Sequence, residues 1–389
     1  MGFPKGFLWG AGSAAHQVEG GNVGNDWWAW ERNPESPCVE ESKDACDQWN
    51  RYLTDLDLLA GLGLNAYRFS VEWSRIEPRQ GQISKCALDH YRHLCEAARR
   101  RGVEPVVVFQ HFTLPLWVAA NGGWSDRATV THFERFCETV AGHLAGAFGY
   151  ACTINEPNVV AAFGYEVGIF PPGERSLARK ESVSELLVAA HLAGAHVIRS
   201  AAPGVKVGLA LAMHEYAGEP GYEEQLSQMR RSTEDVFLEA TKGDDFIGVQ
   251  TYTRLHIGRD GLHGPPAGTR KTQIGLEFRP EALGVTVRRA AAVTGLPVMV
   301  AESGVCTEDD SERIEYVECA LRAVETCLAE GVEVLGYIYW SALDSFEWVL
   351  GYWPKYGLIE VDRQTQARTP RGSGRWLGRV ARANSLDVA

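Results

Sequence analysis

The chain has 389 residues, 45% of them hydrophobic, and a formal net charge of −12. This length and apolar content exclude a disordered protein and a small disulfide-stapled domain, and they predict a large folded core. The acidic balance disfavours nucleic acid as a partner, because a phosphate backbone would be repelled on average. No stretch of the sequence has the length and apolar character of a membrane span, so we expect no membrane partner.

Cysteine usage and the lack of linkers indicate one intracellular unit. The nine cysteines, an odd number, form neither a C-x-x-C pair nor a zinc-ligand spacing, so we expect reduced thiols, no metal and a cytoplasmic protein. FLWGAGSAAH (7–16) mimics a signal-peptide cleavage site, but its apolar run is short and rich in glycine. No linker or composition shift divides the chain, so residues 1–389 are predicted to form a single domain.

Eight short apolar or β-branched runs predict strands, and several are continuous, as in parallel strands buried on both faces. In chain order they are 7–11, 66–73, 103–110, 151–155, 205–212, 246–253, 298–301 and 334–340. Helical patterns lie between them, at 49–60, 88–101, 130–148, 186–200, 283–293 and 314–328. Glycines are predicted to end four of these helices, namely Gly61, Gly102, Gly149 and Gly331.

The polar residues decide between the two folds that alternate strands and helices eight times. A doubly wound sheet gathers its site at one switch point, from few strands. A (β/α)8 barrel gathers a site from the C-terminal ends of most strands. Here capable side chains lie on, end or follow nearly every run: His16, Gln17, Arg68, Glu72, His111, Asn155, Glu156, Tyr252, Glu302 and Trp340. We therefore predict the α/β class and a single (β/α)8 TIM barrel.

Two glutamates among these residues suggest a chemistry. Glu156 and Glu302 end the fourth and seventh runs, and a barrel would bring both to one face. Two carboxyl groups in one pocket can cleave a glycoside when one is protonated and acts as an acid while the other is ionised and attacks. Arg68 and Tyr252 are expected to keep Glu302 ionised. No cation neighbours Glu156 in the sequence, so burial and a nearby negative charge could raise its pKa.

An aromatic and acidic stretch, YWSALDSFEWVLGY (339–352), has the residue types that bind sugars. Aromatic faces cover the C–H groups of a sugar, and carboxylates accept its hydroxyls, which suits Trp340, Glu347 and Trp348. The stretch is equally compatible with an aromatic core whose carboxylates are paired. Gln17 and His111 could likewise be ordinary core residues. DWWAWE (26–31) is assigned only to a rim loop or the core.

Four motifs occur in order along the chain. They are FPKGFLWGAGSAAHQVEGG (3–21), YRFSVEWSRIEP (67–78), TINEPN (153–158), and YWSALDSFEW (339–348) followed by YGLIEVD (356–362). Together they resemble the family 1 glycoside hydrolases, the β-glucosidase and β-galactosidase family: its opening motif, its second strand, its T-x-N-E-P motif and its C-terminal signature. The resemblance runs from about Phe3 to Asp362 and is specific because the motifs keep the family order.

The resemblance implies a retaining enzyme that hydrolyses small-molecule β-D-glucosides, with β-D-galactosides or fucosides as further candidates, and uses no cofactor. It implies Glu156 as acid/base and Glu302 as nucleophile of a covalent glycosyl–enzyme intermediate, with carboxyl groups about 5–5.5 Å apart. Arg68, Asn155 and Tyr252 would support this pair. The residues implied for the first sugar subsite are Gln17, His111, Trp340, Glu347, Trp348 and Tyr356.

The sequence departs from the family pattern at several motifs. The family usually has asparagine where this chain has Ser303 and Gln250. It usually has tryptophan in place of Phe112 and phenylalanine in place of Tyr356. The asparagine usual at position 250 supports the sugar site. The chain is also shorter than most members, and we expect shortened outer loops, mainly between about Gly173 and Phe246, that shape the aglycone entrance.

Three alternatives stay open. A 6-phospho-β-glycosidase of the same family would share Tyr356, but it carries a small residue in place of Glu347 and a lysine in place of Pro354. GAGSAA (10–15) mimics the turn of an NAD-dependent oxidoreductase, although no helical stripe follows it. The third is a sugar-binding barrel without catalysis, but the presence of both carboxylates argues against it. The oligomeric state cannot be read from the sequence.

Overall fold

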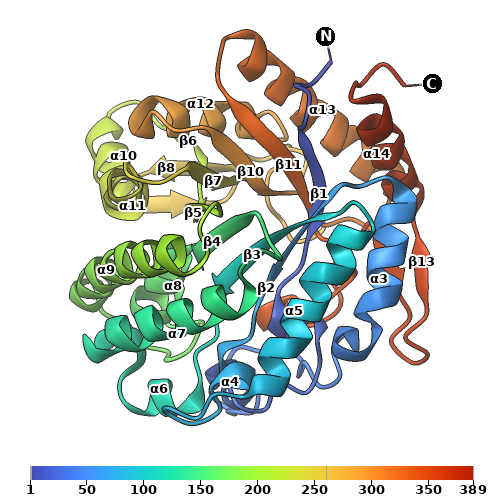
Figure 1. The fold of residues 1–389 in the computed structure, drawn as a ribbon. Helices are drawn as coiled ribbons and strands as arrows, with labels where there is room; N and C mark the ends of the chain where they lie inside the picture. Colours follow the sequence, from blue (N-terminus) through green and yellow to red (C-terminus); the bar gives the residue numbers. More distant parts are fainter. Residues whose placement is uncertain (1, 260, 389) are drawn as a thin grey trace.

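A computed structural model of the protein describes residues 2–259 and 261–388. Eight parallel strands close into a barrel with helices around its outside (Figure 1). The strands are β1 (Leu8–Gly12), β2 (Ala66–Ser70), β3 (Glu104–Gln110), β4 (Tyr150–Asn155), β5 (Lys206–Ala212), β7 (Phe246–Gln250), β10 (Val298–Ser303) and β11 (Val334–Trp340). They are neighbours in chain order, and β11 pairs with β1 to close the barrel. The predicted (β/α)8 TIM barrel is confirmed.

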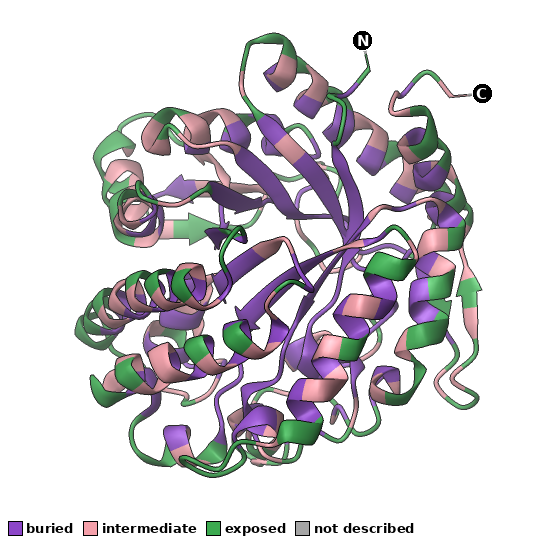
Figure 2. Cartoon of the chain, in the orientation of Figure 1, coloured by how far each residue is buried: buried purple, intermediate pink, exposed green. Residues whose placement is uncertain are grey.

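Helices cover the barrel because each has an apolar side that needs burial. The longer ones are α3 (Gln48–Leu62), α5 (Lys85–Arg100), α7 (Ala128–Leu144), α9 (Leu177–Ala201), α12 (Ala282–Thr294), α13 (Asp310–Ala329) and α14 (Gly372–Ala383). In α5, for example, Leu88, Tyr91 and Leu94 recur at helical spacing and are buried. Figure 2 shows the strands buried along most of their length and the helices exposed mainly on their outer sides.

Shorter elements occupy the connections. They are α1 (Ala15–Val18), α2 (Asp26–Trp30), α4 (Trp73–Ile76), α6 (Leu116–Ala120), η1 (Gly123–Ser125), α8 (Pro157–Ala162), η2 (Phe163–Val167), β6 (Glu215–Gly218), α10 (Glu223–Arg230), η3 (Arg231–Asp235), α11 (Val236–Ala240), β8 (Arg254–Gly258), β9 (Gly261–His263), η4 (Trp348–Leu350), β12 (Ile359–Val361) and β13 (Arg368–Pro370). The connections after β5 and β7 supply β6, β8 and β9, which form a separate three-stranded sheet that the sequence analysis missed.

The inside of the barrel is filled by alternate residues of the strands, as the two-residue period of a strand requires. Val106 and Val108 of β3 belong to an inner cluster that also contains Cys152, while Val107 and Phe109 belong to the larger cluster between strands and helices. Arg68, two residues after the inner Ala66, points into the barrel by the same rule.

Two irregularities turn chemically important residues inward. Strict alternation after Cys152 of β4 would place Ile154 inside, yet Ile154 packs in the outer cluster, and the register of β4 against β5 shifts before Asn155. In β10 the register shifts between Val300 and Glu302. Such bulges re-aim side chains and are frequent beside active sites.

Several predicted boundaries are wrong in detail. Gly61 lies inside α3, and Gly63, with φ of 97°, ends it instead. The predicted helix 130–148 ends earlier as α7, and Gly146, not Gly149, has a positive φ of 79°. The strands predicted at 66–73 and 246–253 end at Ser70 and Gln250 because the chain turns into connections there.

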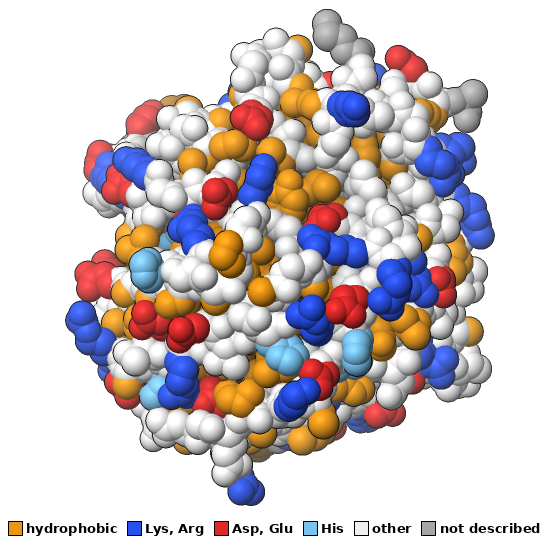
Figure 3. All heavy atoms as spheres, in the orientation of Figure 1, with side chains coloured by type: hydrophobic (Ala, Val, Ile, Leu, Met, Phe, Trp, Pro, Cys, Tyr) orange, Lys and Arg blue, Asp and Glu red, His pale blue; other side chains and the backbone are white. Residues whose placement is uncertain are grey.

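The surface and the helices add two observations. On the face drawn in Figure 3, basic and acidic side chains are interspersed, with no continuous basic area. Within residues 2–259 and 261–388, no helix is both long and apolar enough to cross a membrane.

Candidate active site

Glu302 is held from two sides at the C-terminal end of β10. Arg68 Nη1 donates a hydrogen bond to Glu302 Oε1 over 2.6 Å, and the Tyr252 hydroxyl donates to Oε2 over 2.6 Å. The side chains of Arg68 and Glu302 are only 0% and 5% exposed. A buried carboxylate with a guanidinium on one oxygen and a phenol on the other is fixed in orientation and stabilised in its charged form.

Glu156 occupies a different setting at the end of β4. Its backbone is in the left-handed region, with φ of 44° and ψ of 60°, and it precedes Pro157, the first residue of α8. Its amide donates to the carbonyl of Ala210 on β5 over 2.8 Å, which fixes the turn. No hydrogen bond links its carboxyl to another described residue. The strained turn directs a side chain that the structure leaves free.

Burial raises the pKa of both carboxyl groups, but their neighbours separate them. At Glu156 the charge of Glu302 adds to burial, and the pKa lies well above its ordinary value. At Glu302 the charge of Arg68 and hydrogen bonds from Tyr252, Arg68 and Gln250 oppose the effect of burial. Glu302 is therefore the carboxyl that ionises first, and its charge keeps a proton on Glu156. An acid role for Glu156 and an anion role for Glu302, as expected from the sequence, would require this order of ionisation.

Amide side chains connect the two strand ends. Arg68 Nη2 donates to Asn155 Oδ1 over 2.5 Å, and Gln250 Nε2 donates to the same oxygen over 3.0 Å. Because a guanidinium can only donate, the Asn155 atom that faces Arg68 must be its oxygen. Asn155 Nδ2 then faces His111 Nε2 at 3.2 Å. Burial, and next the charge of Arg68, lowers the pKa of His111 well below its usual value, so this imidazole is neutral.

The aromatic candidates cluster around this network. The ring of His111 lies 5.9 Å from those of Trp340 and Trp348, at interplanar angles of 28° and 19°. The ring of Tyr356 is perpendicular to that of Tyr252 at 6.1 Å. Further rings back Trp348, and the sequence analysis did not assign them to the site: Trp27 at 4.5 Å and Phe112 at 4.9 Å.

Glu347 and Gln17 lie near each other on the loop after β11 and on α1. Ser345 Oγ donates to Glu347 Oε1 over 3.1 Å, and Gln17 Nε2 donates to the carbonyl of Phe346 over 2.7 Å. Burial is the main cause that raises the pKa of Glu347 to about 8. The group is thus a neutral carboxyl at pH 7 in the unliganded protein and can both donate and accept hydrogen bonds.

Several buried polar atoms around this network have no protein partner, among them Gln17 Oε1, His111 Nδ1 and Gln250 Oε1. Buried polar atoms are normally paired, so these atoms have capacity for the hydroxyls of a polyol. By contrast, Glu72 is not part of the site. Its carboxyl accepts from Ser74 and Thr113 and caps α4.

Comparison with known proteins identifies the architecture. The family model of glycosyl hydrolase family 1 matches residues 1–254 and 264–386. The chain belongs to glycosyl hydrolase family 1. A β-glucosidase of an Agrobacterium species is 30% identical over 436 aligned positions, which cover 97% of this chain and 95% of that protein. Since the alignment exceeds the 389 residues of this chain, this family 1 member lacks residues that the relative has.

Solved structures agree. The β-glycosidase BGL167 is 44% identical, with a TM-score of 0.93 and coverage of 100% of this chain and 99% of that chain. The β-glucosidase of Thermotoga maritima in complex with glucoimidazole is 26% identical, with a TM-score of 0.93 and coverage of 99% and 100%. The predicted family and the predicted class, a β-glucosidase-type glycoside hydrolase, are confirmed.

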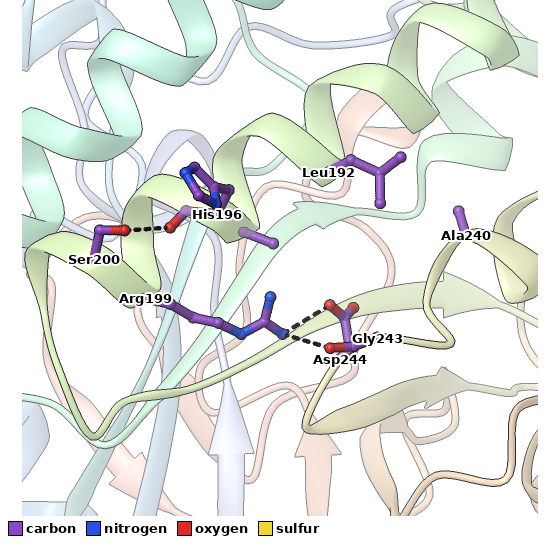
Figure 4. Close-up of a pocket in the computed structure, with 8 residues that line it drawn as sticks. Leu192, His196, Arg199, Ser200, Ala240, Gly243 and Asp244 are labelled. Atoms are coloured by element: carbon purple, nitrogen blue, oxygen red, sulfur yellow. Dashed lines mark hydrogen bonds and ion pairs between the residues drawn. The ribbon is translucent and has the colours of Figure 1, made fainter.

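A groove of about 300 Å³ lies elsewhere on this family 1 enzyme, between α9 and residues 240–244. It is lined by Leu192, His196, Arg199 and Asp244, and it contains none of the predicted site residues (Figure 4). Arg199 Nη2 pairs with Asp244 Oδ1 over 3.0 Å, so its main charges compensate each other. This groove is not the candidate active site.

Proposed function

We propose that the protein is a retaining β-glycosidase that hydrolyses β-D-glucosides, and also β-D-galactosides or fucosides, by double displacement. The observation that carries this proposal is the unequal setting of two glutamates, of which Glu302 is buried and Glu156 is half-buried. Glu302 is ion-paired and hydrogen-bonded, whereas Glu156 is free and keeps its proton. A retaining glycosidase needs this combination of an anionic nucleophile and a neutral acid.

The chemistry follows from these two settings. The Glu302 carboxylate attacks the anomeric carbon while Glu156 gives its proton to the departing glycosidic oxygen, so the aglycone leaves as an alcohol. The glycosyl ester that forms on Glu302 removes its negative charge, which lowers the pKa of Glu156. Glu156, now ionised, takes a proton from the water that attacks the anomeric carbon, and the ester bond to Glu302 breaks.

The choice of glycon is supported by relatives and by the polar lining. The Agrobacterium relative is a β-glucosidase, and the Thermotoga maritima enzyme has been solved with glucoimidazole and with a galacto-hydroximolactam. Gln17, Glu347 and Trp348 offer hydroxyl partners that serve several equatorial-rich sugars. The nine cysteines are free thiols, which supports the expectation of a reducing, cytoplasmic setting.

The 6-phospho alternative is less well supported. Glu347 stands where the phospho-specific pattern has a small residue, and its carboxyl supplies no positive charge to bind a phosphate. The nearest lysine to that pattern, Lys355, donates its ammonium to the carbonyl of Tyr352 over 2.8 Å and is not free.

A panel of aryl β-glycosides tests the proposal. We expect turnover of the β-glucoside, smaller or comparable rates for the galactoside and fucoside, and little for the 6-phospho-β-glucoside. Proton NMR of the first product should show the β-anomer, as retention requires. Initial α-anomer, or no turnover of any aryl β-glycoside, would contradict the proposed function.

A further inference from the structure

Gln250 lies between the two candidate catalytic residues, Glu156 and Glu302. It is the last residue of β7, 1% exposed, and lies directly across from Glu302 in the register of β7 and β10. Its Nε2 donates to Asn155 Oδ1 over 3.0 Å, and Asn155 immediately precedes Glu156. Through Asn155 and Arg68, a continuous path of hydrogen bonds runs from Gln250 to Glu302.

The length of the Gln250 side chain matters because its hydrogen bond to Asn155 spans β5. β5 lies between β7 and β4 in the barrel, so the strands that carry Gln250 and Asn155 are about 10 Å apart. The β5 residue opposite Gln250 is Ala212, whose small side chain leaves room for the crossing. An asparagine here would be shorter by one C–C bond, about 1.5 Å, and from this backbone the 3.0 Å bond would be lost.

Gln250 also presents an acceptor with no protein partner, since its Oε1 is buried and unpaired. Gln250 lies opposite Glu302 and contacts the residue before Glu156. Because both glutamates act at the anomeric carbon in the proposed mechanism, a side chain between them lies close to that carbon. The atoms next to that carbon are the ring oxygen and the carbon that bears the 2-hydroxyl. Only the 2-hydroxyl can donate a hydrogen bond to Gln250 Oε1.

We propose that Gln250 is a positioning and specificity-determining residue: its Nε2 orients Asn155 and its Oε1 accepts the 2-hydroxyl of the glycon. This inference rests on the proposed function. Hydrogen bonds to the 2-hydroxyl strengthen as the transition state forms, so the contribution belongs to kcat as well as to KM. Gln250 thus selects glycons that carry a free 2-hydroxyl over 2-deoxy or 2-amido sugars.

The test compares an aryl β-glucoside with its 2-deoxy analogue in Gln250→Asn and Gln250→Met. Asparagine keeps the amide and loses the reach, whereas methionine keeps the length and loses both polar atoms. We expect kcat/KM on the glucoside to fall about 100-fold and on the 2-deoxy analogue less than about threefold. The acid limb of the pH profile should move upward in Gln250→Met, because Glu302 loses a hydrogen bond that favours its anion.

Gln48→Asn is the matched control, since Gln48 is a buried glutamine on α3 outside the barrel. It should leave the ratio of the two substrates unchanged. Equal losses on both substrates in either folded Gln250 variant would overturn the inference, even if the wild type hydrolyses the glucoside normally. Failure of the wild type on every aryl β-glycoside would instead overturn the proposed function. Methionine, nearly isosteric with glutamine, supplies the result if the asparagine variant does not fold.

Discussion

The ends of β4 and β10 carry the same side chain in different surroundings. At the end of β10, Glu302 is bound by a guanidinium and a phenol, each at 2.6 Å. At the end of β4, Glu156 is half-buried near that anion on a left-handed backbone, and its carboxyl has no hydrogen bond to another described residue. The difference shows that neighbours, not residue type, decide which carboxyl holds a proton and which is ionised. The first three of the following experiments each alter one side of this contrast.

Removal of the anion should have the largest effect. Glu302→Ala should lower kcat/KM on an aryl β-glucoside by about 10⁴-fold or more, because no other group can form the covalent bond. Added azide should restore turnover and give the α-glucosyl azide, detected by NMR. Glu302→Gln, which leaves no space for azide, is the control and should stay inactive. A Glu302→Ala enzyme that retains a tenth of its activity would remove the nucleophile role.

Removal of the acid should have a smaller effect that depends on the leaving group. Glu156→Ala should lower the rate on alkyl glucosides by about 10³-fold, since such alcohols need protonation. On dinitrophenyl glucoside, whose leaving group is stable as an anion, the first step should be nearly unaffected and a burst of dinitrophenol should be seen. An equal loss on both substrates would show that Glu156 does not act as the acid.

Removing a group that stabilises the Glu302 anion should shift the pH profile of kcat/KM. In Arg68→Met the Glu302 carboxyl loses its cation, so its pKa rises and the acid limb of kcat/KM moves to higher pH. We also expect a loss of about 10²-fold at the optimum. Tyr252→Phe removes a single hydrogen bond and should shift the limb in the same direction by less. An unchanged limb in both variants would mean that another group governs it.

The smallest expected effect concerns another carboxyl of the candidate site, Glu347, whose pKa is raised to about 8. Sugar hydroxyls bind more strongly to a carboxylate than to its neutral form, so the inhibition constant for glucose should fall several-fold between pH 7 and 9. Glu347→Gln cannot ionise and should show a constant value over this range. A parallel pH dependence in wild type and variant would assign the titration to another residue.

The barrel and the positions of the candidate site residues could be predicted because each leaves its own signal in the sequence. Apolar runs such as 103–110 and the glycines after α5 and α13 reflect local burial and turn chemistry. Motifs such as TINEPN (153–158) identified Glu156 independently of any periodicity. The combination placed capable residues at the correct ends of the strands.

Other features left no readable signal in the sequence. Strict alternation would have turned Asn155 outward, and the register shift that prevents this arises from pairing with β5, a non-local contact. The sequence marked position 250 as one that supports the sugar site, but it gave no sign of the hydrogen bond from Gln250 to Asn155, which spans β5. β6, β8 and β9 are short and mostly half-exposed, so no apolar run marks them.

The left-handed backbone at Glu156 lowers the stability of the folded protein. A residue with a Cβ is strained there by about 1 kcal/mol or more, and the nearby charge of Glu302 adds to the penalty. Glycine carries neither burden, so an inactive Glu156→Gly protein should melt about 2 °C or more above the wild type. A search for heat-resistant variants that does not also select for activity would therefore favour the replacement of Glu156.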